Sequence, residues 1–211
     1  TVNGKSPAII PDGRFTNMTK TYGDVPFALV PPSSSSPAPF TYSSSDANVA
    51  TINGNLVTIT GKGIATITAS QPASGSYTGG TITATLTVNP ATPIVSMEAI
   101  NKIDGDAPFT LTLNKKSPSP GLITYSSSNP SIATINGDQV TIKAYGNITI
   151  TATQAAAGNY AAGKTTTILT ILPKLVVTWN SPPQVNSGTT VTSTSTANIP
   201  GTFSYSPAIV S

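Results

Sequence analysis

The sequence predicts an all-β protein built from tandem antiparallel β-sandwiches. Its 211 residues are rich in Thr, Ser, Ala, Ile and Val and include 19 Pro and 17 Gly, a composition typical of strands and turns. A hairpin-like stretch recurs 83 residues along the chain, first around Asn53-Gly54 and again around Asn136-Gly137. A pattern that recurs at the spacing of a domain indicates a tandem array.

The recurring stretch covers residues 49–59 and 132–142, and each copy consists of two β-rich runs joined at Asn-Gly. Because both Asn and Gly tolerate positive φ, this dipeptide is a strong local signal for a β-hairpin. We therefore expect Gly54 and Gly137 to be structural residues that close equivalent tight turns.

The runs that follow the hairpins have the two-residue period of strands. In the first copy, apolar residues alternate with hydroxyl residues: Ala65, Ile67 and Ala69 alternate with Thr66, Thr68 and Ser70. Such alternation predicts strands that are buried on one side. About seven such strands at close spacing predict an antiparallel sandwich for each copy.

The repeats divide the chain into four segments. We expect residues 1–7 to be the last strand of a preceding repeat plus a linker, followed by repeat 1 (8–89), repeat 2 (90–172) and an incomplete repeat 3 (173–211). The incomplete repeat would be either a truncation or a unit that a neighbouring chain completes by strand exchange. Proline in the short linkers restricts φ, which favours a stiff rod.

Several short motifs of repeat 1 carry a resemblance to a known family: Tyr22-Gly23-Asp24-Val25-Pro26-Phe27-Ala28-Leu29, Tyr42-Ser43-Ser44-Ser45-Asp46, Val49-Ala50-Thr51-Ile52, Gly63, Ile67-Thr68-Ala69 and Gly75-Ser76-Tyr77. They resemble the bacterial immunoglobulin-like (Ig-like) repeat found in tandem in large surface adhesins and in bacteriophage virion proteins. Repeat 2 departs from the pattern at Ile103 and Asp104. The resemblance implies Ig-like sandwiches that serve mostly as spacers, and it transfers no catalytic residue.

The composition argues against enzymatic and nucleic-acid functions. The sequence has no His and no Cys, so Ser-His-Asp and Cys-His systems and the usual zinc sites are not available. Ten basic and seven acidic residues give a net charge of +3 without the clustering that nucleic-acid binders show. No run approaches the roughly 20 apolar residues of a membrane span. We expect no enzymatic activity, no cofactor and no insertion into a membrane.

Asp104 and Asp106 are the candidate calcium ligands of the sequence, because Asp104-Gly105-Asp106 could bring two carboxylates to one hard cation. Repeat 1 has Tyr22 in place of Asp104, however, and calcium prefers six to eight oxygen ligands. We therefore favour a turn role, in which the Asp24 and Asp106 side chains bind nearby backbone N–H groups.

Two sets of tyrosines recur at equivalent positions: Tyr42, Tyr125 and Tyr205, and Tyr77 and Tyr160. Tyrosines could stack on sugars, but recurrence at fixed strand positions favours packing at the core or at a corner. Lys20 and Lys102 also recur; they could form isopeptide cross-links, and solvated side chains are the favoured interpretation.

The function that we expect is a non-enzymatic spacer in a long extracellular fibre or adhesin at a bacterial surface, with neighbouring Ig-like repeats of the same or adjacent chains as partners. One alternative is a bacteriophage tail-fibre or capsid-decoration module of the virion that weakly contacts host polysaccharide. Another is a carbohydrate-binding accessory module of a secreted enzyme. An exposed row of aromatic side chains would favour the last, whereas aromatics buried equivalently in each repeat would favour a spacer.

Overall fold

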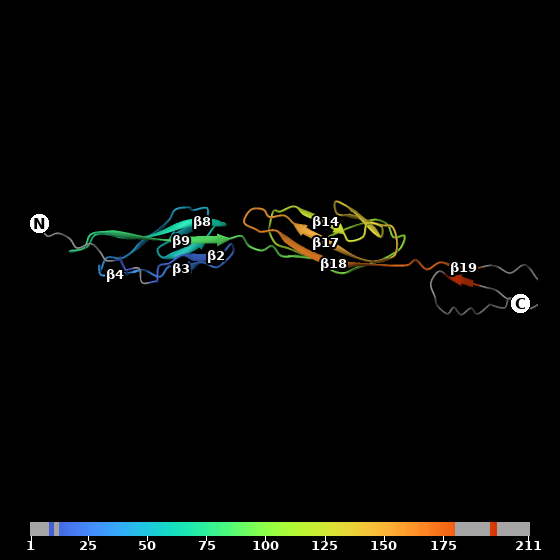
Figure 1. Cartoon of the computed structure of the whole chain (residues 1–211), viewed down its shortest axis with the longest axis horizontal. Helices are drawn as coiled ribbons and strands as arrows, with labels where there is room; N and C mark the ends of the chain where they lie inside the picture. The colour runs from blue at the N-terminus through green and yellow to red at the C-terminus, as the bar shows by residue number, and fades with distance from the viewer. Residues whose placement is uncertain (1–8, 11–12, 180–194, 198–211) are drawn as a thin grey trace, which may run out of the picture. The chain divides into compact units, whose positions relative to one another are not determined.

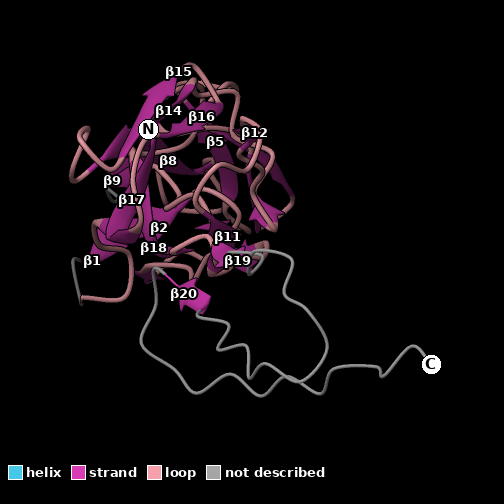
Figure 2. Cartoon of the chain, turned by 90° about the vertical axis from the view of Figure 1, so that its right-hand side faces the viewer, coloured by secondary structure: helices cyan, strands magenta, loops and turns pink. Residues whose placement is uncertain are grey.

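The computed structural model describes residues 9–10, 13–179 and 195–197. This part contains strands, turns and loops (Figures 1 and 2), so it offers no helix that is long and apolar enough to cross a membrane. The predictions for residues 1–7 and for Tyr205 lie outside the described residues.

The chain forms two compact units. The first contains the described residues up to Val95 together with Lys115–Ile123 and Thr153–Gly163. The second contains Ser96–Asn114, Thr124–Ala152 and the described residues from Lys164 on.

Nine of the described strands come from repeat 1: β1 (Ile9–Ile10), β2 (Met18–Thr21), β3 (Phe27–Ala28), β4 (Ser33–Ser34), β5 (Thr41–Ser44), β6 (Ala50–Asn53), β7 (Leu56–Ile59), β8 (Gly63–Gln71) and β9 (Gly80–Asn89). Another nine come from repeat 2: β10 (Val95–Ser96), β11 (Ile100–Ile103), β12 (Phe109–Thr110), β13 (Lys115–Lys116), β14 (Ile123–Ser127), β15 (Ala133–Asn136), β16 (Gln139–Ile142), β17 (Gly146–Gln154) and β18 (Gly163–Leu172). After these, β19 (Val177–Trp179) pairs antiparallel with β20 (Ser195–Ala197).

Each set of nine strands has the sheet order of an immunoglobulin-type sandwich. In repeat 1 a four-stranded sheet β2-β9-β8-β5 accompanies a three-stranded sheet β3-β7-β6, and β1 pairs with β4. Repeat 2 reproduces this order as β11-β18-β17-β14, β12-β16-β15 and β10-β13. Strands β5, β8 and β9 thus correspond to C, F and G of an immunoglobulin domain, and β3, β6 and β7 to B, D and E. The expected all-β, Ig-like fold class is confirmed.

One pairing differs from the fully antiparallel sheets that we expect from the sequence. β2 runs parallel to β9, and β11 runs parallel to β18 in the same way. A parallel pair needs a long connection, and here the rest of the sandwich supplies it, because β2 and β9 stand near the two ends of the repeat. β2 therefore pairs with the edge of β9 that β8 leaves open, and β11 does the same for β18.

The alternation in the sequence determines which side chains form the two cores. Ala65, Ile67 and Ala69 are buried, as expected, with at most 1% of their surface exposed. The largest fully buried apolar side chains occupy equivalent positions in the two repeats: Val57, Ile67 and Leu86, and Val140, Ile150 and Leu169. Each repeat therefore has its own hydrophobic cluster, built on the same positions.

The repeated hairpin forms as predicted, but its turn lies one residue further along the chain. Asn53 pairs with Leu56, so the two-residue loop is Gly54-Asn55 rather than Asn53-Gly54. Gly54 has a φ of 61° and Gly137 a φ of 62°, whereas no described non-glycine residue has a positive φ. Positive φ at the first loop position alone is the pattern of a type II′ turn. The turn thus requires Gly at this position and does not use the tolerance of Asn for positive φ.

This geometry makes Gly54→Ala a test of the turn. A Cβ at Gly54 would meet no atom within 4 Å, so the cost is conformational alone. We expect a loss of about 1 kcal/mol in the free energy of unfolding, measured by urea titration. Gly54→Asn is the matched control and should cost less, because Asn tolerates this backbone region better. Equal stability of Gly54→Ala and the unmodified protein would contradict the assigned turn.

Candidate functional site

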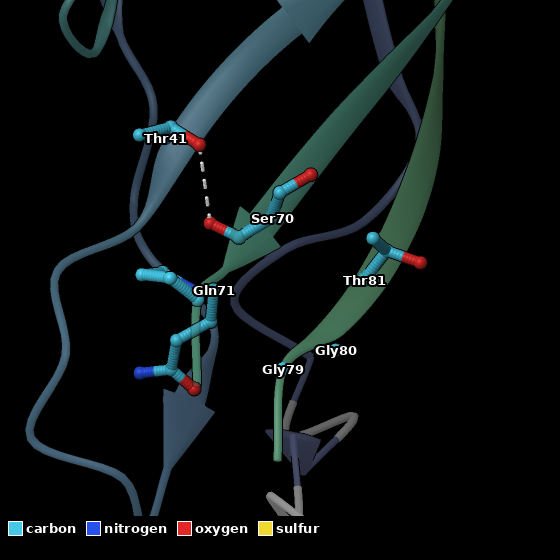
Figure 3. Close-up of a pocket in the computed structure, with 7 residues that line it drawn as sticks. Thr41, Ser70, Gln71, Gly79, Gly80 and Thr81 are labelled. Atoms are coloured by element: carbon cyan, nitrogen blue, oxygen red, sulfur yellow. Dashed lines mark hydrogen bonds between the residues drawn. The ribbon is translucent and has the colours of Figure 1, made fainter. Parts of the chain in front are cut away.

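A hollow with a cavity volume of about 500 Å³ lies at the end of the β8–β9 hairpin (Figure 3). We call it the hydroxyl hollow; it is lined by Thr41, Ser70, Gln71, Pro72, Gly79, Gly80 and Thr81. The volume falls within the range of small-molecule sites. None of the lining side chains is ionisable, so the hollow offers hydrogen bonds without charge.

The strand register aligns three hydroxyl residues at this site. Thr41 of β5 lies opposite Ser70 of β8, and Ser70 lies opposite Thr81 of β9. The Thr41 hydroxyl donates a hydrogen bond to the carbonyl oxygen of Ser70 at 3.4 Å (Figure 3). Polar groups on neighbouring strands suit an uncharged polar ligand, but the site has no acid, base or activated nucleophile of the kind that catalysis needs.

Gln71 lies next to this row and is 3% exposed. Its Nε2 donates hydrogen bonds to the carbonyl oxygens of Ser36 at 3.2 Å and Ala38 at 2.6 Å. Its Oε1 accepts a hydrogen bond from the Ser34 hydroxyl at 2.6 Å. The amide therefore fastens the loop that precedes β5 to the end of β8, and it satisfies groups that would otherwise be buried without partners.

Gln154 occupies the equivalent position in repeat 2 and is fully buried. Its Nε2 donates to the carbonyl oxygens of Ser119 at 3.1 Å and Gly121 at 3.2 Å. The Oε1 of Gln154 and the Ser117 hydroxyl are buried and have no hydrogen-bond partner in the described part of the chain. Neither glutamine is among the residues expected to be structural, although a polar residue that follows an apolar alternation and recurs 83 residues later is a usable sequence signal.

The aspartates of the two repeats close equivalent turns. Asp106 accepts the N–H of Ile103 on its carboxylate at 3.0 Å and donates its own N–H to the Ile103 carbonyl at 3.0 Å. Asp24 makes the same two bonds with Thr21, at 2.9 and 3.0 Å. Asp104 is half-buried and donates its N–H to Leu172. Among the described residues, no group of three or more His, Cys, Asp or Glu gathers as a metal site.

Tyr42 and Tyr125 are half-buried against the cores of their own repeats. The ring of Tyr42 lies 6.1 Å from Phe15 and 6.5 Å from Phe40, measured between centroids. Burial raises the pKa of Tyr42. Burial, and to a lesser degree the negative charge of Asp138, raises the pKa of Tyr125. These two tyrosines therefore belong to the cores rather than to an exposed aromatic row.

Tyr77 and Tyr160 close equivalent turns. Tyr77 exchanges backbone hydrogen bonds with Ser74 at 3.0 and 3.1 Å, and Tyr160 exchanges them with Ala157 at 3.1 and 3.2 Å. The Tyr160 ring also lies edge-on to Tyr22 at 5.7 Å, and both residues belong to the first compact unit.

Within that first unit the linker residue Ala91 is hydrogen-bonded on both sides of its backbone. Its N–H donates to the carbonyl oxygen of Asn159 at 3.0 Å, and its carbonyl oxygen accepts the N–H of Ala161 at 2.8 Å. The Asn159 side chain accepts a third bond, from the N–H of Lys62 at 3.0 Å. Hydrogen bonds thus fix the position of Ala91, and the neighbouring prolines restrict the backbone of the linker further.

The recurring lysines contact aromatic rings, whereas the sequence favours solvated side chains. The Lys20 ammonium lies 4.6 Å from the centroid of the Phe27 ring, and the Lys102 ammonium lies 4.7 Å from that of Phe109. Both are cation–π contacts. They explain why the lysines recur with a phenylalanine seven residues later.

No protein-family model matches the sequence, and no curated protein matches it. Among solved structures, domains EC1–4 of Drosophila N-cadherin are 13% identical with a TM-score of 0.37, covering 81% of this chain and 50% of that one. Domains 4 and 5 of the S-layer protein SbsC are 20% identical with a TM-score of 0.30, covering 63% and 70%.

A third structure is a SusE-like, surface-located polysaccharide-binding protein from the heparin utilisation locus of Bacteroides thetaiotaomicron. It is 13% identical with a TM-score of 0.29, covering 78% of this chain and 34% of that one. The chain spans half of the N-cadherin chain and about a third of the Bacteroides chain. Scores this far below 0.5 show no shared family, and the strand order of the chain itself defines its class as an Ig-like sandwich protein.

Gln71→Leu tests the buried amide. The change keeps the approximate volume but leaves the Ser36 and Ala38 carbonyls and the Ser34 hydroxyl without their partner. We expect the free energy of unfolding to fall by about 2–3 kcal/mol, measured by urea titration. The exposed Gln139→Leu is the control and should change it by less than about 0.5 kcal/mol. A loss at Gln71 no greater than at Gln139 would contradict the role of the amide.

The raised pKa values of Tyr42 and Tyr125 predict a loss of stability in alkali. A raised pKa in the folded state favours the neutral phenol, so this contribution is complete below the unfolded pKa of about 10 and is lost as pH rises through the folded pKa. The double variant Tyr42→Phe and Tyr125→Phe should therefore lose stability less steeply above about pH 10. Unfolding by urea at several pH values measures the slope, and the exposed Tyr145→Phe is the control. Identical slopes for all three proteins would refute this assignment.

Proposed function

We propose that the chain is a non-enzymatic spacer segment of a long extracellular fibre or adhesin, at a bacterial cell surface, built of tandem Ig-like domains. The observation that carries the proposal is the equivalent, half-buried position of Tyr42 and Tyr125 against the two cores. These aromatics serve the fold in each repeat instead of forming a binding row. The features that recur in the two repeats are therefore those that stabilise the fold. A spacer needs a stable fold and no binding site.

The held linker supports the same function. A spacer keeps its length only if its junctions resist bending, and a flexible linker would shorten its average reach. Ala91 is bound through both its N–H and its carbonyl group, and proline restricts φ on either side of it. Neighbouring Ig-like repeats of the same or adjacent chains are the partners that this role implies.

We also propose that the chain has no catalytic activity. The hydroxyl hollow is lined by Thr, Ser, Gln, Pro and Gly, and the whole sequence has no His or Cys. A serine or threonine hydroxyl is a weak nucleophile unless a neighbouring base or a lowered pKa activates it. The hollow has no such group in its lining.

The hydroxyl hollow favours a second candidate, a weak contact with uncharged polysaccharide. Three hydroxyl residues on adjacent strands, Thr41, Ser70 and Thr81, could exchange hydrogen bonds with sugar hydroxyls. Such a contact would suit a virion tail-fibre or capsid-decoration module, or an accessory module of a secreted enzyme. In repeat 2 the position of Thr81 is taken by Lys164, so the same row is not repeated.

Affinity electrophoresis of the full chain in gels containing soluble dextran or amylose separates the two candidates. A spacer should migrate as it does in the absence of polysaccharide. Retardation of the unmodified chain, abolished by Thr81→Lys, would overturn the spacer proposal in favour of a carbohydrate contact at the hollow. Thr166→Lys, on the outward face of β18, is the matched control for added charge.

A further inference from the structure

The side chain of the Asn in each of the two hairpin Asn-Gly pairs has no role in the turn. Gly54 and Gly137 supply the positive φ, whereas Asn53 and Asn136 have negative φ. Both asparagines are exposed at the tip of a hairpin. In the described part of the chain, neither side chain takes part in a hydrogen bond. The recurrence of these two asparagines is therefore not explained by conformation.

We propose that Asn53 and Asn136 are sites of spontaneous deamidation. The backbone nitrogen of Gly54, after losing its proton to the solvent, attacks Cγ of Asn53. The new N–Cγ bond forms as the Cγ–Nδ2 bond breaks, and the side-chain nitrogen takes up a proton from the solvent and leaves as ammonia. Water then opens the resulting five-membered imide at one of its two carbonyl carbons, which gives either aspartate or isoaspartate. One water is consumed and one ammonia is released, and the same step applies to Asn136 with Gly137.

The local structure selects these two positions. Among the described asparagines, Asn53 and Asn136 are the ones followed by glycine, which has no Cβ to obstruct attack by its nitrogen. The N–H groups of Gly54 and Gly137 take part in none of the hydrogen bonds of the described residues. By contrast, Asn17 is engaged, since its Oδ1 accepts the N–H of Thr85 at 2.9 Å.

The modification would act on the sandwich through the hairpin tip. The N–H of Leu29 donates to the carbonyl oxygen of Asn55 at 2.8 Å, and the N–H of Leu111 donates to that of Asp138 at 2.8 Å. Leu29 and Leu111 are core residues with 3% and 4% of their surface exposed. Isoaspartate adds one carbon to the main chain immediately before the two-residue loop. The bond that holds each core leucine next to its hairpin would then be strained or lost.

The test is storage of the native full chain in mildly acidic and mildly alkaline buffer, followed by charge-based separation and peptide mapping. All chains tested carry Asn3→Gln, because Asn3 also precedes glycine in the sequence. We then expect two successive, more acidic species, each one charge unit lower, with aspartate and isoaspartate at positions 53 and 136. Their formation should be faster in alkali, because the attacking nitrogen must lose a proton. Variants Asn53→Gln and Asn136→Gln should each remove one of the two species, whereas Asn147→Gln, at an exposed strand position, should remove neither.

Two results would overturn the proposal. One is a native chain that stays unmodified at both positions over a period in which the urea-unfolded chain is converted, which would show that the folded hairpin protects the pair. The other is modification spread equally over Asn48, Asn101 and Asn147, which would show that the glycine and the turn confer no selectivity.

Discussion

The in-register pairing of β8 with β9 is the interaction on which the rest of repeat 1 depends. Nine residue pairs run from Gly63 opposite Val88 to Gln71 opposite Gly80. The register directs Ile67 and Leu86 inward together, and both are fully buried. A slip of one residue would turn every such side chain to the outer face. β5 then adds to β8 and β2 to β9, so that the whole four-stranded sheet is aligned on this hairpin.

Gln71 shows why the hairpin ends in an amide instead of another apolar residue. The alternation along β8 directs the Gln71 side chain inward. At this end of the strand it meets the loop before β5, whose carbonyl groups also point inward. An amide can donate two hydrogen bonds and accept others, which matches the two carbonyls and one hydroxyl that it meets. Repeat 2 keeps the two donations, but the Ser34 hydroxyl bond has no equivalent at Ser117. The two repeats therefore share this hydrogen-bonding arrangement, but repeat 2 leaves one acceptor and one hydroxyl without a partner among the described residues.

The features that could be predicted from sequence are those that depend on residue type and short-range order. Alternation at Ala65, Ile67 and Ala69 predicts a buried face because the period belongs to the strand itself. The parallel partner of β9 and the contact of Lys20 with Phe27 depend on where distant or turned segments meet, which no local pattern specifies. The sequence places the turn at Asn53-Gly54, one residue too early, because Asn-Gly and Gly-Asn each fit a tight hairpin and only the strand register distinguishes them.

The positions at which the two repeats differ bear on function more directly than those at which they agree. Val57, Ile67 and Leu86 recur unchanged because each core needs them, so their recurrence says nothing about a ligand. Around the hydroxyl hollow, by contrast, Lys164 stands where repeat 1 has Thr81, and Ala155 stands where it has Pro72. A ligand that binds the row of hydroxyls in repeat 1 would find a charged lysine at the equivalent position of repeat 2. Adhesion by a periodic row of equal sites would need the opposite pattern, with constant surface positions. The constancy of the cores and the divergence of this surface agree with the proposed role as a spacer.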